Sequence, residues 1–301
     1  MKISRRSAVL SLCGSLLAAL NVPASAQPAR PLRVVASFSI LADMLRQIGG
    51  ADVEVSALAG PDADAHVFEP RPADARRLAE ADLVVVNGLG FEGWMDRLVR
   101  SSGYRGPVVV ASQGVVPLRM GGAPDPHAWQ DLGHAQRYVQ TLSEALVRLR
   151  PAQAAPFQAR AARYIEKLAA LDAEVRRSLA SVPVERRRVI TAHAAFGYFS
   201  AAYGVEFVAA QGRNTDSEPS AADVARLIDQ IRARRVTAVF VENITDPRLV
   251  ERIAREGKAT VGGRLYSDAL SPPGTEADTY LKFFAHNARA IVAALTPAAT
   301  R

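Results

Sequence analysis

Short apolar runs alternate with amphipathic stretches along the first half of the chain. The apolar runs have the length and composition of strands, at residues 33–36, 53–58, 83–86 and 108–111. The stretches between them have helical apolar spacing, at residues 40–48, 72–81 and 94–99. The run at 83–86, Leu-Val-Val-Val, is apolar at every position, as is typical of a parallel strand buried on both faces. This alternation predicts a parallel sheet covered by helices.

The same alternation returns in the second half. Strands are predicted at residues 189–192, 207–209, 238–241 and 260–265. Helices are predicted at residues 195–203, 220–233, from 247 onward and at 276–294. Ser220 and Asp223 form a capping box at the start of one helix, and Asp246-Pro247 starts another. The second half therefore predicts a parallel sheet of its own.

Two long helical stretches separate the halves. Asp131 is placed to cap a helix that runs to Arg150, and Pro151 starts a stretch of some thirty residues that ends near Pro183. About thirty helical residues span roughly 45 Å, which indicates a rigid strut rather than a flexible linker. We therefore predict an α/β fold in which a long rigid helix at 151–182 joins one parallel-sheet lobe at 27–150 to another at 183–301.

The first 26 residues have the composition of a cleavable signal peptide. Lys2, Arg5 and Arg6 form a positive start, residues 8–22 an apolar run, and Ala24-Ser25-Ala26 a small-residue cleavage site. The apolar run is too short for a membrane-spanning helix. The sequence thus predicts export, and Ser4-Arg5-Arg6 leaves the twin-arginine route open.

Removal of the signal peptide changes the charge and the cysteine count. The segment carries three of the 37 basic residues and none of the 30 acidic ones, so the formal net charge falls from +7 to +4. The remaining basic residues are interspersed and lack neighbouring aromatic residues, which argues against nucleic-acid binding. Cys13, the one cysteine, is also lost, which excludes disulfides and thiolate metal sites in the mature chain.

A glycine-rich turn follows the predicted strand at 83–86. The segment Gly88-Leu89-Gly90-Phe91-Glu92-Gly93 has the spacing of a dinucleotide fingerprint. A nucleotide site would also need an acidic residue at the end of the next strand, but that strand ends Val-Ala-Ser at 110–112. We therefore interpret these glycines as a tight turn.

Three histidines and one aspartate lie beyond predicted strand ends: His66, His127, His193 and Asp268. In open α/β sheets, ligands bind outside the carboxyl ends of the strands. Two lobes that face each other there would bring the four side chains together. Such a set suits zinc and is acceptable for manganese or iron. Taken singly, each residue is better explained as a surface, capping, core or turn residue, and only the set of four favours a metal site.

Other side chains near these positions carry weaker signals. Glu242 ends an apolar strand and is a candidate acceptor for an imidazole N–H, with a surface ion pair as the equal alternative. His134 and His286 lie on predicted helices, and we interpret both as non-ligands. Three aromatic residues adjoin candidate ligands and either exclude water or belong to the core: Phe68, Trp129 and Phe196.

Five segments carry a more specific signal, in this order along the mature chain: Gly60-Pro61-Asp62-x-Asp64-x-His66-x-Phe68-Glu69-Pro70, Asn87-Gly88-x-Gly90-x-Glu92-x-Trp94, Asp125-Pro126-His127-x-Trp129, Ala192-His193-x-Ala195-Phe196-Gly197-Tyr198-Phe199 and Tyr203-Gly204. Together they resemble the TroA-like and ZnuA-like metal receptors of bacterial zinc and manganese ABC importers. The resemblance implies two pseudo-symmetric α/β lobes joined by one long helix, with little hinge closure. It also implies a single metal ion between the lobes, bound by His66, His127, His193 and Asp268.

The same resemblance implies a function. The protein would be a periplasmic solute-binding protein that captures a divalent metal ion and delivers it to the membrane permease of an ABC importer. Zn²⁺, or alternatively Mn²⁺ or Fe²⁺, would be the transported ligand, and the protein would not be an enzyme. We expect a monomer that does not bind nucleic acid.

Departures from the family pattern bear on the choice of metal. Zinc-scavenging members often have a His- and acid-rich loop before the second ligand, whereas residues 112–124 contain no His, Asp or Glu. Manganese-type members tend to have Glu where this chain has His193, and the extra nitrogen ligand favours zinc. We interpret Gln130-Asp131-Leu132, where the family has Leu-Asp-Pro, as uninformative.

Two rival functions fit the same residues. A zinc hydrolase would need an open coordination position and a general base, but the sequence has no His-Glu-x-x-His or Gly-x-Ser-x-Gly element. An adhesin or siderophore receptor on the same scaffold would retain a chelated organic ligand instead of a bare ion. Metal titration and a search for turnover separate the three hypotheses.

Overall fold

The computed structural model describes residues 30–296 except 235 and 237, and the chain from Pro31 onward forms one compact unit. The predicted signal peptide at 1–26 lies outside the described residues. Among the residues that are described, no helix has both the length and the apolar composition needed to cross a bilayer.

The first sheet has four parallel strands in the order β2-β1-β3-β4. Their bounds are β1 (Leu32–Phe38), β2 (Val53–Ala59), β3 (Leu83–Val86) and β4 (Val108–Val110). Three helices connect them: α1 (Ser39–Gly49), α2 (Pro72–Ala79) and α3 (Met95–Ser102). We call this sheet with its helices the N-terminal lobe. The predicted strands and helices of this half are all present, with ends within about three residues of those expected.

The second sheet is also parallel and has the order β10-β9-β7-β8. Its strands are β7 (Arg188–Thr191), β8 (Glu206–Ala209), β9 (Ala238–Glu242) and β10 (Thr260–Leu265). Its helices are α6 (Gly197–Tyr203), α7 (Ala221–Arg234), α8 (Pro247–Gly257) and α9 (Tyr280–Leu295). We call this the C-terminal lobe. In chain order each sheet places its second, first, third and fourth strands side by side, so the expected pseudo-symmetry is confirmed.

Two of the four predicted helix starts in the second half are confirmed by their caps. The hydroxyl of Ser220 accepts a hydrogen bond from the backbone of Asp223 (3.1 Å), and Asp246 accepts one from Arg248 (2.9 Å). Helix α9 begins four residues later than predicted. Its start is set by Thr279, whose side chain accepts a bond from the amide of Lys282.

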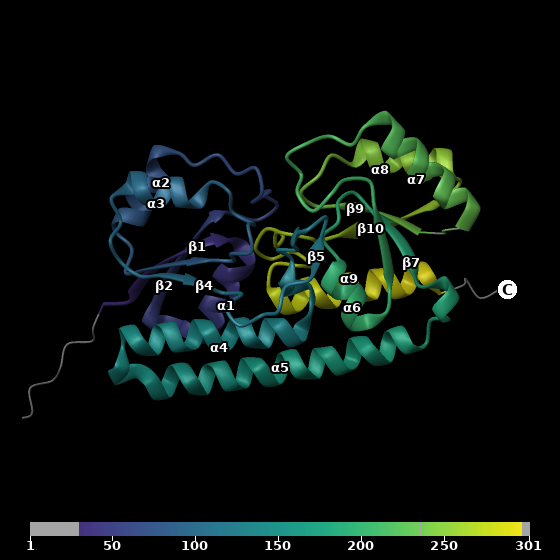
Figure 1. Ribbon diagram of the computed structural model, residues 1–301. Helices are drawn as coiled ribbons and strands as arrows, with labels where there is room; N and C mark the ends of the chain where they lie inside the picture. Colours follow the sequence, from purple (N-terminus) through teal and green to yellow (C-terminus); the bar gives the residue numbers. More distant parts are fainter. Residues whose placement is uncertain (1–29, 235, 237, 297–301) are drawn as a thin grey trace, which may run out of the picture. The chain divides into compact units, whose positions relative to one another are not determined.

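Between the two lobes the sequence forms two long helices, α4 (Leu132–Leu149) and α5 (Ala154–Ala180). They pack side by side (Figure 1). Asp131 caps α4 as predicted, because its carboxylate accepts a hydrogen bond from the amide of Gly133. Helix α5 contacts α1 of the N-terminal lobe and both α6 and α9 of the C-terminal lobe. The predicted long helix is therefore present and bridges both lobes, while the exact domain boundaries at 27–150, 151–182 and 183–301 stay predictions.

One hydrophobic core is shared by both lobes. It contains fully buried side chains from five helices, including Leu41, Leu142, Leu168, Phe199 and Phe283. The outer helices of each lobe form separate clusters, with Leu98 in the N-terminal one and Ile253 in the C-terminal one. A hinge motion between the lobes would have to break apolar contacts of the shared core, which favours a rigid arrangement.

Candidate metal centre

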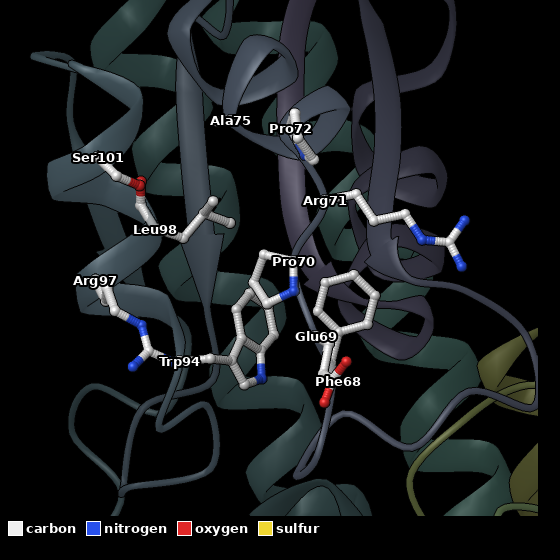
Figure 2. Close-up of a pocket in the computed structure, with 10 residues that line it drawn as sticks. All are labelled: Phe68, Glu69, Pro70, Arg71, Pro72, Ala75, Trp94, Arg97, Leu98 and Ser101. Atoms are coloured by element: carbon white, nitrogen blue, oxygen red, sulfur yellow. The ribbon is translucent and has the colours of Figure 1, made fainter.

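His66 lies in the loop between β2 and α2, which is held from both sides of the residue. Its backbone amide donates to Asp64 Oδ1 (2.9 Å), and the carbonyl of the preceding Ala65 accepts a hydrogen bond from Trp94 Nε1 (2.7 Å). Figure 2 shows the indole of Trp94 next to the ring of Phe68 in a pocket lined by α2, α3 and the end of this loop. Phe68 therefore packs behind the loop that carries His66.

His127 follows a short hairpin that the sequence did not predict, formed by β5 (Arg119–Met120) and β6 (Ala123–Pro124). Asp125 fixes the histidine twice: Oδ1 accepts the amide of His127 (3.0 Å) and lies 2.7 Å from its Nδ1. This contact leaves Nε2 directed to the other candidate ligands. Asp125 is a functional residue that the sequence analysis recorded only as part of a motif.

His193 lies just after β7 and is held by Glu242, which ends β9. Glu242 Oε1 accepts the amide of His193 (2.9 Å), and Oε2 lies 2.6 Å from Nδ1, although this second pair lacks the angles of a regular hydrogen bond. Both side chains are fully buried. Of the two alternatives for Glu242, the structure selects the imidazole partner over the surface ion pair.

Asp268 follows β10, and its position is set from the other lobe. The carbonyl of Ser267 accepts hydrogen bonds from Trp129 Nε1 (2.9 Å) and Gln130 Nε2 (2.8 Å). Both donors lie in the short turn after His127, within the N-terminal lobe. The amide of Gln130 thus orients the residue next to a candidate ligand across 137 positions of sequence, a role that the comparison of Gln130-Asp131-Leu132 with the family pattern did not indicate.

The four side chains meet in one buried cluster. His66 Nε2 lies 3.2 Å from His127 Nε2 and 3.2 Å from Asp268 Oδ2, and His193 Nε2 lies 3.1 Å from the same oxygen. Each residue offers a ligand atom, and these atoms all lie within 4.8 Å of one another. The side chains are at most 4% exposed. The geometry thus assembles the set that the sequence analysis singled out.

The donor set fits a divalent cation. If Nδ1 of His127 and of His193 carries the proton toward its carboxylate, both Nε2 atoms present lone pairs to the centre. Asp268 Oδ1 is buried and has no hydrogen-bond partner. Such convergent acceptors repel one another unless a cation lies among them. Three imidazoles and one carboxylate suit zinc, manganese or iron.

The electrostatics differ between the histidines. Burial lowers the pKa of His127 below its ordinary value, against the opposing effect of Asp268 and Asp125. Burial also acts to lower the pKa of His193, but the charges of Glu242 and Asp268 outweigh it and raise that pKa well above its usual value. Burial acts to raise the pKa of Asp268, yet His193 and His127 hold it far below its usual range. The cluster therefore keeps its carboxylate ionised.

Two aromatic rings form the wall behind the N-terminal histidines. The ring of Phe91 lies 4.6 Å from that of His66, and the ring of Trp129 lies 5.3 Å from that of His127, measured between centroids. Both aromatic residues are buried. Trp129 and Phe196 both belong to the shared hydrophobic core, where Phe196 stacks on Phe207, so the core alternative holds for both residues. The sequence analysis missed Phe91 because it lies inside the glycine-rich turn.

The backbone amides at the glycine-rich turn bind a side chain of the protein. Gly88, Leu89 and Gly90 all have positive φ, so the chain reverses sharply after β3. The carboxylate of Glu92 then accepts the backbone N–H groups of Asn87 (2.6 Å) and Gly88 (3.1 Å). These amides would face a phosphate in a dinucleotide site, but here they bind an internal carboxylate. The tight-turn interpretation agrees with this arrangement.

The two remaining histidines lie elsewhere. The ring of His134 contacts Tyr198, and Nε2 of His286 lies 3.1 Å from the carbonyl of Arg264. Neither belongs to the cluster of four.

Comparison with known proteins identifies the family of this chain. The profile of the family described as "ZnuA: Zinc-uptake complex component A periplasmic" matches residues 34–294. The chain belongs to this family. The zinc-binding protein TroA of Treponema pallidum is 38% identical over 282 residues, which cover 90% of this chain and 91% of TroA. The manganese-binding lipoprotein MntA of Bacillus subtilis is 32% identical over 274 residues (88% and 90%), and the iron-binding protein YfeA of Yersinia pestis is 32% identical over 275 residues (90% and 88%).

Solved structures of periplasmic metal-binding proteins have the same fold. The periplasmic zinc-binding protein TroA from Treponema pallidum superposes with a TM-score of 0.86 at 35% identity, covering 89% of this chain and all of that one. A Mn-bound periplasmic metal-binding protein from Candidatus Liberibacter asiaticus gives 0.81 at 26% identity, covering 88% of this chain and all of that one. The family predicted from the five motifs is confirmed.

Proposed function

We propose that this ZnuA-family protein captures one divalent transition-metal ion in the periplasm and delivers it to the membrane permease of an ABC importer. The observation that carries the proposal is the buried cluster of three imidazoles and one carboxylate between the lobes. The curated relatives, whose names specify zinc, manganese or iron binding, support it. The family is one of transport receptors rather than enzymes.

The metal ligands we propose are His66, His127, His193 and Asp268. Each histidine would bind through Nε2, because Nδ1 of His127 and of His193 faces a carboxylate of the protein. Zinc is the favoured ion, since three nitrogen donors with one oxygen rank zinc above manganese and iron. Relatives named for the three metals are of similar identity, so their names alone do not separate the ions.

The geometry disfavours the two rival functions. Four protein donors complete a tetrahedral zinc shell, which leaves no open position for the water that a hydrolase activates. A siderophore or other chelated ligand needs a cavity of its own, whereas the imidazole nitrogens of His66 and His127 lie only 3.2 Å apart. A bare ion is the ligand that matches this spacing.

The setting in the cell follows from the same proposal. A periplasmic receptor needs export, for which residues 1–26 would serve, and the route, twin-arginine or general, is an open part of the proposal. A monomer suffices, because one chain supplies all four donors. Nucleic acid has no role in it.

Metal binding is the experiment that tests this function. The chain without residues 1–26 is purified, stripped with a chelator and titrated with Zn²⁺, Mn²⁺ and Fe²⁺ in competition, with elemental analysis of the loaded protein. We expect one ion per chain, with zinc bound most tightly. Absence of stoichiometric binding, or hydrolysis of ester or peptide substrates by the zinc form, would overturn the proposal.

A further inference from the structure

The candidate ligands are too deeply buried for an ion to reach them without movement. Their side chains are between 0 and 4% exposed, and the core beneath them is shared by both lobes. Opening the lobes as rigid bodies would cost many apolar contacts. If the protein binds metal as proposed above, the ion must enter and leave through a local rearrangement near the cluster.

One polar segment contacts the flanks of the cluster. This segment, residues 211–217 (Gln-Gly-Arg-Asn-Thr-Asp-Ser), follows β8 and is here called the strap. Within its own lobe, Gln211 donates its amide to the carbonyl of Ala192 (2.9 Å), and the carbonyl of Gly212 accepts the amide of Ala194 (2.9 Å). The strap therefore runs directly beside His193.

The strap also reaches the N-terminal lobe at two places. Arg213 Nη1 donates to the carbonyl of Pro124 (3.4 Å), which precedes the aspartate that fixes His127. The hydroxyl of Thr215 donates to Asp64 Oδ2, and Oδ1 of the same carboxylate holds the amide of His66. For each of the three candidate histidine ligands, the strap therefore contacts a residue that lies within three positions of it in the sequence.

The loop that carries His66, between β2 and α2, makes a second contact with the C-terminal lobe through Asp62. Asp62 accepts a hydrogen bond from Asn243 Nδ2 (2.9 Å), and its own amide donates to the carbonyl of Leu270 (2.9 Å). That contact includes a hydrogen bond between two backbone groups, whereas both bonds from the strap to the N-terminal lobe are donated by side chains, those of Thr215 and Arg213. The strap lacks apolar side chains, so little burial opposes its movement. Of these two connections between the lobes, we therefore expect the one made by the strap to open more easily than the one made by Asp62.

A cavity of about 170 Å³ lies against the strap. Its lining includes Thr215, Ala192 and three acidic residues, Asp64, Glu218 and Asp246, of which Asp246 is paired with Arg248. Negative charge at this point favours a cation over an anion. The cavity also leaves room for the strap to move.

We propose that the strap is the gate through which the metal ion enters and leaves, and that the hydrogen bond from Thr215 to Asp64 holds it shut. The bond joins a neutral donor to a carboxylate, which makes it stronger than a neutral pair. Its loss increases the population of the open strap without removing a ligand. Entry and release of the ion then accelerate together, and the equilibrium affinity changes little.

The test compares two substitutions at one position. Thr215→Val keeps the shape of the side chain but removes the hydroxyl, and Thr215→Ser keeps the hydroxyl. Stopped-flow measurements with Zn²⁺, and with excess chelator for release, give both rate constants. We expect both rates to rise about tenfold or more in Thr215→Val, with the dissociation constant within about threefold of the native value. Thr215→Ser is expected to exchange zinc at native rates.

Three other outcomes would contradict the proposal that the strap is the gate. It is wrong if Thr215→Val exchanges zinc at native rates, if only release accelerates, or if Thr215→Ser behaves like Thr215→Val. A native protein that does not bind zinc at all refutes the proposed function instead, so the two failures are distinguishable. Hydrogen exchange on the native chain is a second measurement, independent of folding of the variants: zinc should slow exchange of the amides of 212–217, and unchanged exchange contradicts the gate.

Discussion

The two lobes share one strand order but contribute chemically different halves to the cluster. The N-terminal lobe supplies two imidazoles, His66 and His127, with the carboxylate of Asp125 behind one of them. The C-terminal lobe supplies His193 between two fully buried carboxylates, Glu242 and Asp268. The symmetry of the fold does not extend to its electrostatics.

The pKa directions show what this difference does. Burial lowers the pKa of His127, so this imidazole is neutral and able to coordinate without losing a proton. The charges of Glu242 and Asp268 outweigh burial at His193 and raise its pKa, so the C-terminal half holds a proton where a metal ion would bind. Metal and proton therefore compete at His193 more than at His127.

The largest expected effect comes from removing the histidine of the C-terminal half. His193→Ala deletes one of the four proposed ligands and leaves Glu242 buried without its imidazole partner, so we expect zinc affinity to fall by about a thousandfold or more. Competitive titration against a chelator of known affinity measures the loss. His134→Ala, outside the cluster, is the matched control and should bind as the native protein does. Unchanged affinity in His193→Ala would remove this residue from the site.

The shared core predicts that the two lobes unfold together. Leu168 is fully buried in α5, within the core that both lobes share, so Leu168→Ala should reduce the free energy of unfolding by about 2–5 kcal/mol. Ile253→Ala, in the outer cluster of the C-terminal lobe, is the comparison. We expect one transition in Leu168→Ala, with faster hydrogen exchange in both sheets, and faster exchange mainly around α8 in Ile253→Ala. Two separate transitions in Leu168→Ala would contradict a common core.

The carboxylates behind the histidines allow a finer comparison. Glu242→Gln and Asp125→Asn keep the shape of each side chain and remove its charge, and each should weaken zinc binding by about 10- to 100-fold. We expect the larger loss in Glu242→Gln, because Glu242 is the strongest of the charges that act on His193, whereas the charge of Asp268 acts more strongly than that of Asp125 on His127. Isothermal titration of both variants measures the difference. Equal losses would mean that the halves are electrostatically alike.

The smallest effect is that of pH. As the pH rises, the stability of the metal-free protein should fall, whereas the affinity for zinc should increase. Because the folded-state pKa of His193 is raised, its contribution to the stability of the metal-free protein is full below about pH 6.5, the unfolded value, and disappears as the pH rises through the folded value. Zinc affinity should increase over the same window, by up to about tenfold per pH unit, as the competing proton is lost.

Two measurements check the pH dependence. Urea unfolding of the metal-free chain gives its stability at each pH, and competitive zinc titration at the same pH values gives the affinity. In Glu242→Gln the rise in zinc affinity should move to lower pH. An affinity that is independent of pH between about 6 and 8 would be inconsistent with a proton held by His193.

The sequence alone determined the parts that depend on local pattern. Periodicity and capping residues located the strands and helices to within a few residues, because burial on one face and satisfied helix ends leave a mark in neighbouring positions. The positions of His66, His193 and Asp268 after predicted strands indicated a shared site, since the carboxyl ends of parallel strands lie at one edge of a sheet.

Only the tertiary structure decided what depends on distant contacts. Gln130 orients the residue before Asp268, Phe91 forms a wall beside His66, and Thr215 bonds to Asp64 across 151 positions of sequence. None of these residue types is unusual where it stands, so no local pattern marks it. Likewise, the continuity of the core between the lobes arises from helix α5 packing against both, which depends on their folding together rather than on either half alone.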